Sequence, residues 1–203
     1  MTLPVAPAPA AQPIPLLVLL PTLRAGGAER VLLTLLRHLD RARFQPMLAV
    51  VDGQPPELAG DLPDDVVFVD LQCQRVSRAG PALWHLIRQR RPRIVLSTLS
   101  HLNLMLALLR PLMPRGTRFV ARESNVLSQS LQDEPRPALF RLAHRLLYRR
   151  FDLIVCQSRA MQDDLCLHFG VRREATRVIP NPVDLERVRR LADEPIAADP
   201  APR

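Results

Sequence analysis

A glycine-rich turn is the first part of this sequence that could bind a ligand. An apolar run at residues 14–20 leads to a loop with Gly26 and Gly27, and a helical pattern follows with Glu29 in its first turn. Glycines allow the backbone to approach a ligand closely, and a helix N-terminus favours an anion such as phosphate or carboxylate. Glu29 can accept a hydrogen bond from a sugar hydroxyl or stabilise the helix dipole. A tight turn without a ligand explains the glycines equally well.

A second polar cluster directly follows another apolar run. Arg122, Glu123, Ser124 and Asn125 stand at the end of the strand expected at residues 118–122. An arginine can hold a phosphate, a glutamate can act as a base toward a hydroxyl, and serine and asparagine can position hydroxyl groups. The alternative is a surface Arg–Glu pair followed by a turn.

A lone histidine stands at a third position that follows an expected strand. His101 follows the strand expected at residues 93–98, where a histidine can act as a base or bind a hydroxyl. A helix cap or a satisfied structural residue is the alternative interpretation. Ser100 could cap the next helix without help from the histidine, and Ser158 is expected to cap a later helix.

Alternating strands and helices must position these side chains. The strands are nearly continuous apolar runs, which indicates burial on both faces and therefore a parallel sheet covered by helices. We predict one α/β domain with a doubly wound, Rossmann-like parallel sheet and helices on both faces. The expected strands are 14–21, 44–51, 66–69, 93–98, 118–122, 152–155 and 176–179, and the expected helices are 27–39, 81–90, 102–112, 138–150 and 158–169.

The folded domain is expected to span residues 14–184. Residues 1–13 are rich in proline and alanine and are predicted to be disordered. Residues 185–203 are predicted to be a connector and a disordered tail. In such a sheet, ligands bind beyond the carboxyl ends of the strands, which is where the three polar clusters fall.

Composition narrows the class of protein. The chain has 203 residues, a net charge of +8 and 28 basic residues, all of them arginine. Aromatic residues make up 4% of it, too few for an RNA-binding platform, so no nucleic-acid partner is expected. The 3 cysteines are an odd number without CxxC spacing, which favours a reducing, cytoplasmic compartment without disulfides. No histidine or acidic cluster has metal-ligand spacing, so no metal is expected.

One helical segment carries a basic stripe. Arg141, Arg145 and Arg149 recur at every fourth residue of the helix expected at 138–150. A basic amphipathic helix can lie on an anionic membrane surface, so these arginines are candidates to face the inner side of a membrane. A core-packed helix with a solvated arginine face is the alternative.

Four features of the sequence together resemble the N-terminal half of family 4 retaining glycosyltransferases. They are the glycine turn, the Arg122–Asn125 cluster, Ser158 with Asp164, and the segment 179–184. The resemblance implies a two-domain GT-B fold, with an acceptor-side N-terminal domain and a C-terminal domain that binds the nucleotide sugar. It implies that Gly26 and Gly27 approach the donor diphosphate, and that Asn181 and Pro182 form the hinge between the domains.

The resemblance also implies a catalytic site. Glu123 and His101 would line the acceptor side, although many relatives have a histidine where this chain has Arg122 and Glu123. The nucleotide sugar would be a substrate, and no cofactor is expected. The acceptor would be a glycan or a lipid-linked molecule.

The family's donor domain carries an acidic pair spaced as E-x7-E. Glu186 and Glu194 have this spacing, but they fall in the expected connector and tail. The chain is therefore expected to be inactive without a C-terminal donor domain supplied in trans.

Two other functions remain open. One is a non-catalytic module that binds a membrane surface or a partner protein. The other is a dinucleotide-binding oxidoreductase domain with Asp52 at the ribose, which the absence of GxGxxG disfavours.

Overall fold

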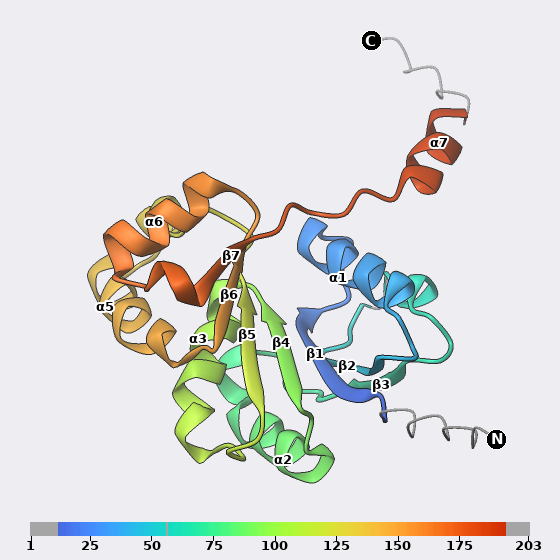
Figure 1. Ribbon diagram of the computed structural model, residues 1–203, viewed down its shortest axis with the longest axis horizontal. Helices are drawn as coiled ribbons and strands as arrows, with labels where there is room; N and C mark the ends of the chain where they lie inside the picture. Colours follow the sequence, from blue (N-terminus) through green and yellow to red (C-terminus); the bar gives the residue numbers. More distant parts are fainter. Residues whose placement is uncertain (1–11, 56, 194–203) are drawn as a thin grey trace, which may run out of the picture.

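The computed structural model describes residues 12–55 and 57–193 and contains one seven-stranded parallel sheet. The strand order is β3-β2-β1-β4-β5-β6-β7 (Figure 1). The sheet is Rossmann-like and doubly wound, as predicted, because the chain moves outward from β1 in one direction and outward from β4 in the other. The strands are β1 (Ile14–Thr22), β2 (Phe44–Asp52), β3 (Val67–Asp70), β4 (Ile94–Thr98), β5 (Arg118–Arg122), β6 (Leu153–Cys156) and β7 (Thr176–Val178).

Helices pack on both faces of this sheet. The α-helices are α1 (Gly27–His38), α2 (Gly80–Arg90), α3 (Ser100–Leu109), α4 (Leu127–Ser130), α5 (Pro137–Leu147), α6 (Arg159–Phe169) and α7 (Leu185–Asp193). Short 3-10 turns stand between them, at η1 (Ala59–Asp61), η2 (Val76–Arg78), η3 (Arg110–Leu112), η4 (Leu131–Asp133), η5 (Tyr148–Arg150) and η6 (Arg173–Ala175).

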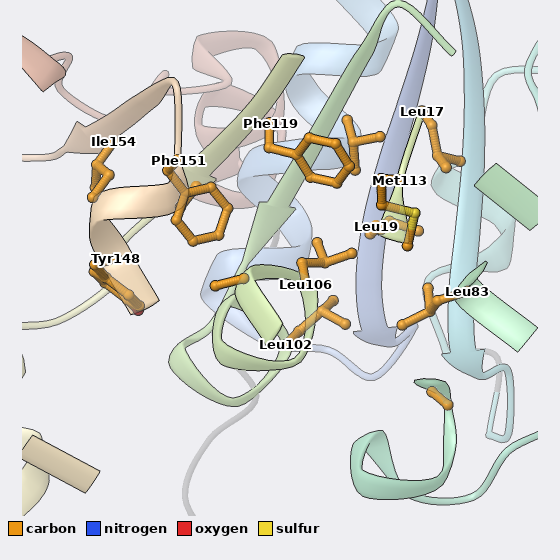
Figure 2. Packing of buried hydrophobic residues seen from close by; sticks show 14 of the residues in the cluster. Leu17, Leu19, Leu83, Leu102, Leu106, Met113, Phe119, Tyr148, Phe151 and Ile154 are labelled. Carbon is orange, nitrogen blue, oxygen red and sulfur yellow. The ribbon is translucent and has the colours of Figure 1, made fainter. Parts of the chain in front are cut away.

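The apolar run of β1 supplies two cores because successive side chains point to opposite faces. Leu16, Val18 and Leu20 pack with α1 on one face. Leu17 and Leu19 join the larger core on the other face, which includes residues of α2, α3 and α6. Figure 2 shows part of this larger core, including aromatic rings that pack beside the leucines of α3.

The structure adds two helices that the sequence pattern did not predict. Helix α4 follows the polar cluster after β5, and helix α7 occupies residues 185–193, for which the sequence predicts a connector. Two predicted helices, 102–112 and 138–150, are α-helical over most of their length. In each of them the last three residues form a 3-10 turn. The disorder predicted for residues 1–11 and 194–203 concerns residues outside the described ranges.

Candidate functional site

The three polar clusters meet at the carboxyl edge of the sheet. Strand β1 pairs with β4, and β4 pairs with β5, all in parallel. The loops after these strands therefore lie side by side at the point where the winding direction reverses, which is where open α/β sheets bind ligands.

Glu123 lies just past β5, on the face covered by α3 and α5. Its side chain accepts hydrogen bonds from Asn103 Nδ2 at 2.8 Å, from Ser100 Oγ at 3.2 Å, and from the Tyr148 hydroxyl. The residue is 1% exposed, and burial raises the pKa of its carboxyl group while the hydrogen bonds and Arg122 act in the opposite direction. The protein therefore encloses the carboxyl group on all sides. The catalytic role predicted for Glu123 stays a prediction and requires this enclosure to open.

Arg122 points to the opposite face of the sheet, because it is the preceding residue of an extended chain. Its guanidinium donates to Thr98 Oγ1 and Ser124 Oγ, each at 3.1 Å, and to Asn181 Oδ1 at 2.6 Å. Burial lowers the pKa of this guanidinium, and the carboxylates of Glu123 and Glu29 partly offset the effect. In this conformation, Arg122 ties the loop after β5 to the predicted hinge. Its predicted contact with a ligand stays a prediction.

The predicted hinge is anchored at two points. Asn181 bonds to Arg122, and its Nδ2 donates to Gln157 Oε1 at 3.0 Å. Asp184 forms an ion pair with Arg37 of α1 at 3.2 Å. Residues 179–184 thus run from β7 across the edge of the sheet toward α1 (Figure 1). Pro182 is exposed within this segment.

Glu29 occupies the helix end at which an anion was predicted. A Cβ placed on Gly26 would lie 2.1 Å from Glu29 Oε2, whereas one on Gly27 would meet nothing within 4 Å. The carboxylate of Glu29 therefore folds back over the backbone at the start of α1, where the helix dipole favours it. This geometry agrees with the helix-stabilising interpretation of Glu29, and Gly26 leaves the space that the carboxylate needs.

His101 is exposed at the start of α3, and Glu134 lies beside it. Its Nε2 is 3.3 Å from Glu134 Oε1, and 63% of its side chain is exposed. Ser124 is half-buried and Asn125 is exposed in the loop after β5. These three predicted site residues are open to solvent, unlike Arg122 and Glu123.

The capping role predicted for Ser100 is wrong. Leu99 stands at the N-cap of α3 without a side-chain cap bond, and Ser100 Oγ donates to Glu123 instead. Ser100 is the first residue of α3 and therefore lies one position past the N-cap, where a side-chain oxygen would accept from the first-turn N–H groups. Ser158 does cap α6, as predicted, and accepts from Met161 N at 3.3 Å.

Several residues of the site were missed by sequence reasoning. Tyr148 and Asn103 hold Glu123, and Thr98 holds Arg122, yet each lies 20 or more residues away from its partner in the sequence. Leu99 adopts a left-handed backbone with φ of 69°, which the residue type gave no reason to expect. Such a strained position persists only where neighbouring structure imposes it, and these positions cluster at functional sites.

A groove of about 910 Å³ opens beside this edge. It runs along α3 between η2 on one side and η4 with α5 on the other. Its lining is mainly apolar, with polar groups at the sheet edge. The residues that line it include Pro21, Leu99, Ser100, His101, Leu104, Met105, Leu108, Asn125, Leu131, Phe140 and Leu147.

The arginine stripe lies on the outside of α5 and η5, away from this edge. Arg141, Arg145 and Arg149 are all exposed. Beside them on the helix surface, Leu139, Leu142 and Leu146 are 56%, 52% and 58% exposed. The outer surface of α5 is therefore both basic and apolar.

Residues 12–55 and 57–193 contain neither a metal-binding cluster nor a membrane-spanning helix. No group of three or more histidine, cysteine, aspartate or glutamate side chains there could hold a metal ion. In the same residues, each helix is too short or too polar to cross a bilayer.

The chain matches one family model and several solved structures. The model for Glycosyltransferase Family 4 matches residues 25–187. No curated protein matches the sequence. Anabaena HepE, solved in complex with UDP and glucose, is 18% identical with a TM-score of 0.64, over 85% of this chain and 46% of HepE.

Two further structures have similar scores. Sucrose-phosphate synthase from Thermosynechococcus elongatus is 13% identical with a TM-score of 0.63, over 90% of this chain and 53% of the synthase. The UDP-GlcNAc 2-epimerase from Methanocaldococcus jannaschii is 13% identical with a TM-score of 0.60, over 83% of this chain and 46% of the epimerase. The chain spans about half the length of these proteins. At such identities the likeness establishes the fold, and one fold serves different reactions.

Proposed function

Because this chain belongs to glycosyltransferase family 4, we propose that it is the acceptor-side half of a glycosyltransferase. In this proposal it moves a sugar from a nucleotide sugar to a glycan or a lipid-linked acceptor, together with a donor-binding half. The observation that carries the proposal is the polar edge of the sheet, where the loops after β1, β4 and β5 converge beneath the anchored hinge. Without the other half, the chain is expected to be inactive.

On the donor side, the start of α1 would face the diphosphate of the nucleotide sugar. Gly27 is exposed there, and the free N–H groups of the first turn favour an anion. The carboxylate of Glu29 lies over the same helix end, next to Gly26. A diphosphate that binds there has to displace this carboxylate, because two anions repel each other at one helix end.

On the acceptor side, we assign proton transfer to His101, one of the two catalytic residues predicted from the sequence. It is exposed, and Glu134 can orient its ring. Ser124 and Asn125 would position acceptor hydroxyls. Glu123 would act as a positioning residue, since its carboxyl group accepts a hydrogen bond from Ser100, the residue that precedes His101.

The nucleotide sugar enters this scheme as a substrate, so the proposal needs no cofactor. The protein contributes orientation and stabilises the charge that develops on the leaving diphosphate.

The test is a chimera in which the donor-binding half of HepE follows residue 184 of this chain, assayed with UDP-glucose and a panel of acceptors. We expect transfer by the chimera and none by this chain alone. His101→Gln should lower kcat about 10²–10⁴-fold, the usual contribution of a general acid or base. His85→Gln is the matched control, because His85 is exposed on α2 and does not line the groove. A chimera that binds UDP-glucose yet transfers nothing, or equal activity of the two variants, would count against the proposal.

The outer surface of α5 favours a second function, attachment to an anionic membrane. Helical geometry places the exposed leucines between the arginine stripe and the buried side of the helix. That arrangement lets leucines enter the headgroup region while arginines reach lipid phosphates. We propose that the protein binds peripherally to a membrane through this surface, as part of the enzyme or as a non-catalytic module.

Vesicles that contain phosphatidylglycerol test the attachment. Replacing Arg141, Arg145 and Arg149 with glutamine should weaken binding about 100-fold, at about 1 kcal/mol for each arginine.

The control removes the same charge from Arg90, Arg115 and Arg118, which are exposed elsewhere on the protein. Equal losses in the two triple variants would show that net charge alone drives binding and would reject α5 as the attachment surface.

A further inference from the structure

The groove along α3 has an ordered polarity. His101, Leu104, Met105 and Leu108 line it at helical spacings of three, four and seven residues, so they form one stripe along α3. The stripe begins with a polar side chain at the sheet edge and continues with apolar ones over about 10 Å of helix. Leu108, at the far end, is 58% exposed. This large apolar side chain stands open in the groove.

The walls extend the apolar lining away from the sheet edge. Val76 stands on one side of α3, and Leu131, Phe140 and Leu147 stand on the other. A volume of about 910 Å³ lies within the range of about 300–1,000 Å³ that is typical of small-molecule sites. The size and the lining fit a long, apolar chain.

The polar end of the groove coincides with the site of the proposed reaction. Ser100, the first residue of α3, and Asn125, in the loop after β5, both line the groove. Glu134 lines it as well, beside His101. Arg75, in the segment after β3, adds a positive charge to the lining. A ligand that fills the groove can therefore present a polar or anionic head where sugar transfer would take place.

A neutral histidine keeps the α5 wall free of charge. His144 is 1% exposed, and its Nδ1 lies 2.7 Å from the carbonyl oxygen of Phe140. Its Nε2 is buried without a hydrogen-bond partner among the described residues. Burial lowers the pKa of His144, so the ring is uncharged at neutral pH. An apolar ligand meets no charge from this histidine.

We propose that the groove holds the hydrocarbon chain of a lipid acceptor, with the polar head at the His101 end and the chain running toward Leu108. The inference rests on the proposed function only in calling the lipid an acceptor. Binding of the hydrocarbon chain to the groove requires neither a donor nor catalysis. The outer leucines of α5 lie on the same helix as the groove wall, so a membrane-bound protein would hold the groove close to its source of lipid.

The test measures binding of hexyl, octyl and dodecyl phosphate to the full chain by calorimetry, below the concentrations at which these compounds form micelles. Each methylene buried in the groove should strengthen binding about fourfold until the groove is full. Leu108→Gln should weaken the binding of dodecyl phosphate roughly tenfold. It should leave the affinity for hexyl phosphate unchanged, since the shorter hydrocarbon chain ends before Leu108. His101→Gln should shift all three affinities by the same factor.

Leu167→Gln is the matched control. Leu167 is 78% exposed on α6 and does not line the groove, so the same substitution there should leave all three affinities unchanged. Affinities that do not depend on chain length, or equal effects of Leu108→Gln and Leu167→Gln, would overturn the proposal. The proposal would also fail if the protein bound no alkyl phosphate, formed a dimer, and lost that dimer in Leu108→Gln. The groove would then be a contact between two copies of the chain. A chimera without transferase activity that still binds the chains would overturn only the proposed function.

Discussion

At the scale of single residues, the most consequential contact is between Glu123 and Tyr148. A buried carboxyl group is costly unless it is hydrogen-bonded, and three donors from α3 and η5 surround this one. Glu123→Ala removes the acceptor for all three donors, and we expect a loss of about 3 kcal/mol in the free energy of unfolding. Glu123→Gln keeps an acceptor of the same shape and should cost far less. Urea unfolding of both variants checks the difference, and equal losses would contradict it.

The same residue should give stability a pH dependence. Because the pKa of Glu123 is raised in the folded protein, its protonated form favours folding. Its contribution is fully present below the ordinary carboxyl pKa of about 4.3 and is lost as pH rises through the folded-state value. The stability of Glu123→Gln relative to the wild type should therefore increase with pH above about 4.3. Urea titrations between about pH 5 and about pH 8 measure this difference, and a difference that stays constant with pH would count against it.

Gly26 and Gly27 form a natural pair of test sites at the start of α1. Gly26→Ala forces the Glu29 carboxylate away from the helix end, which should cost about 0.3–1 kcal/mol of stability. Gly27→Ala meets open space at the first helical position and should be neutral or stabilising, since alanine favours helix over glycine. Urea midpoints compare the two variants. The interpretation fails if Gly27→Ala is the more damaging change.

At the scale of elements, the cap of α6 has a direct test. Ser158→Ala removes the acceptor for Met161 N and should cost about 1 kcal/mol. Ser128→Ala is a fitting control, because its backbone N–H, which alanine keeps, makes the bond to Asp164. Thermal unfolding measures both variants, and a smaller shift for Ser158→Ala than for Ser128→Ala would argue against the cap.

The sequence predicted long elements well and the contacts between them poorly. Strand β5 has the bounds that its apolar run predicted, because a strand buried on both faces leaves a local signal. Helix α4 is only 4 residues long, which is too short for a periodic pattern. The clusters after β1, β4 and β5 were placed at one edge because parallel strands align their carboxyl ends. The sequence did not reveal that Glu123 points inward and His101 outward, since this depends on Tyr148, 25 positions further along the chain.

At the scale of the whole molecule, the hinge is attached to the site that it would move. Asn181→Ala removes one hydrogen-bond acceptor from the buried guanidinium of Arg122. We expect it to lower the free energy of unfolding by about 1–2 kcal/mol. Asn125→Ala, at an exposed asparagine, should cost little. In the chimera with a donor half, Asn181→Ala should also broaden the range of interdomain distances in small-angle X-ray scattering. Equal stabilities and identical scattering for the two variants would show that the anchor is unimportant.

The central position of β1 has a consequence for synthesis of the chain. Strand β1 pairs with β2 on one side and with β4 on the other, and β4 begins only at residue 94. At the usual rates of translation, the ribosome needs several seconds to produce the residues between them. Throughout that interval one edge of β1, with five consecutive apolar residues from Leu16 to Leu20, has no partner strand. Such an edge is a template for aggregation, so we expect the nascent chain to need a chaperone until β4 has emerged.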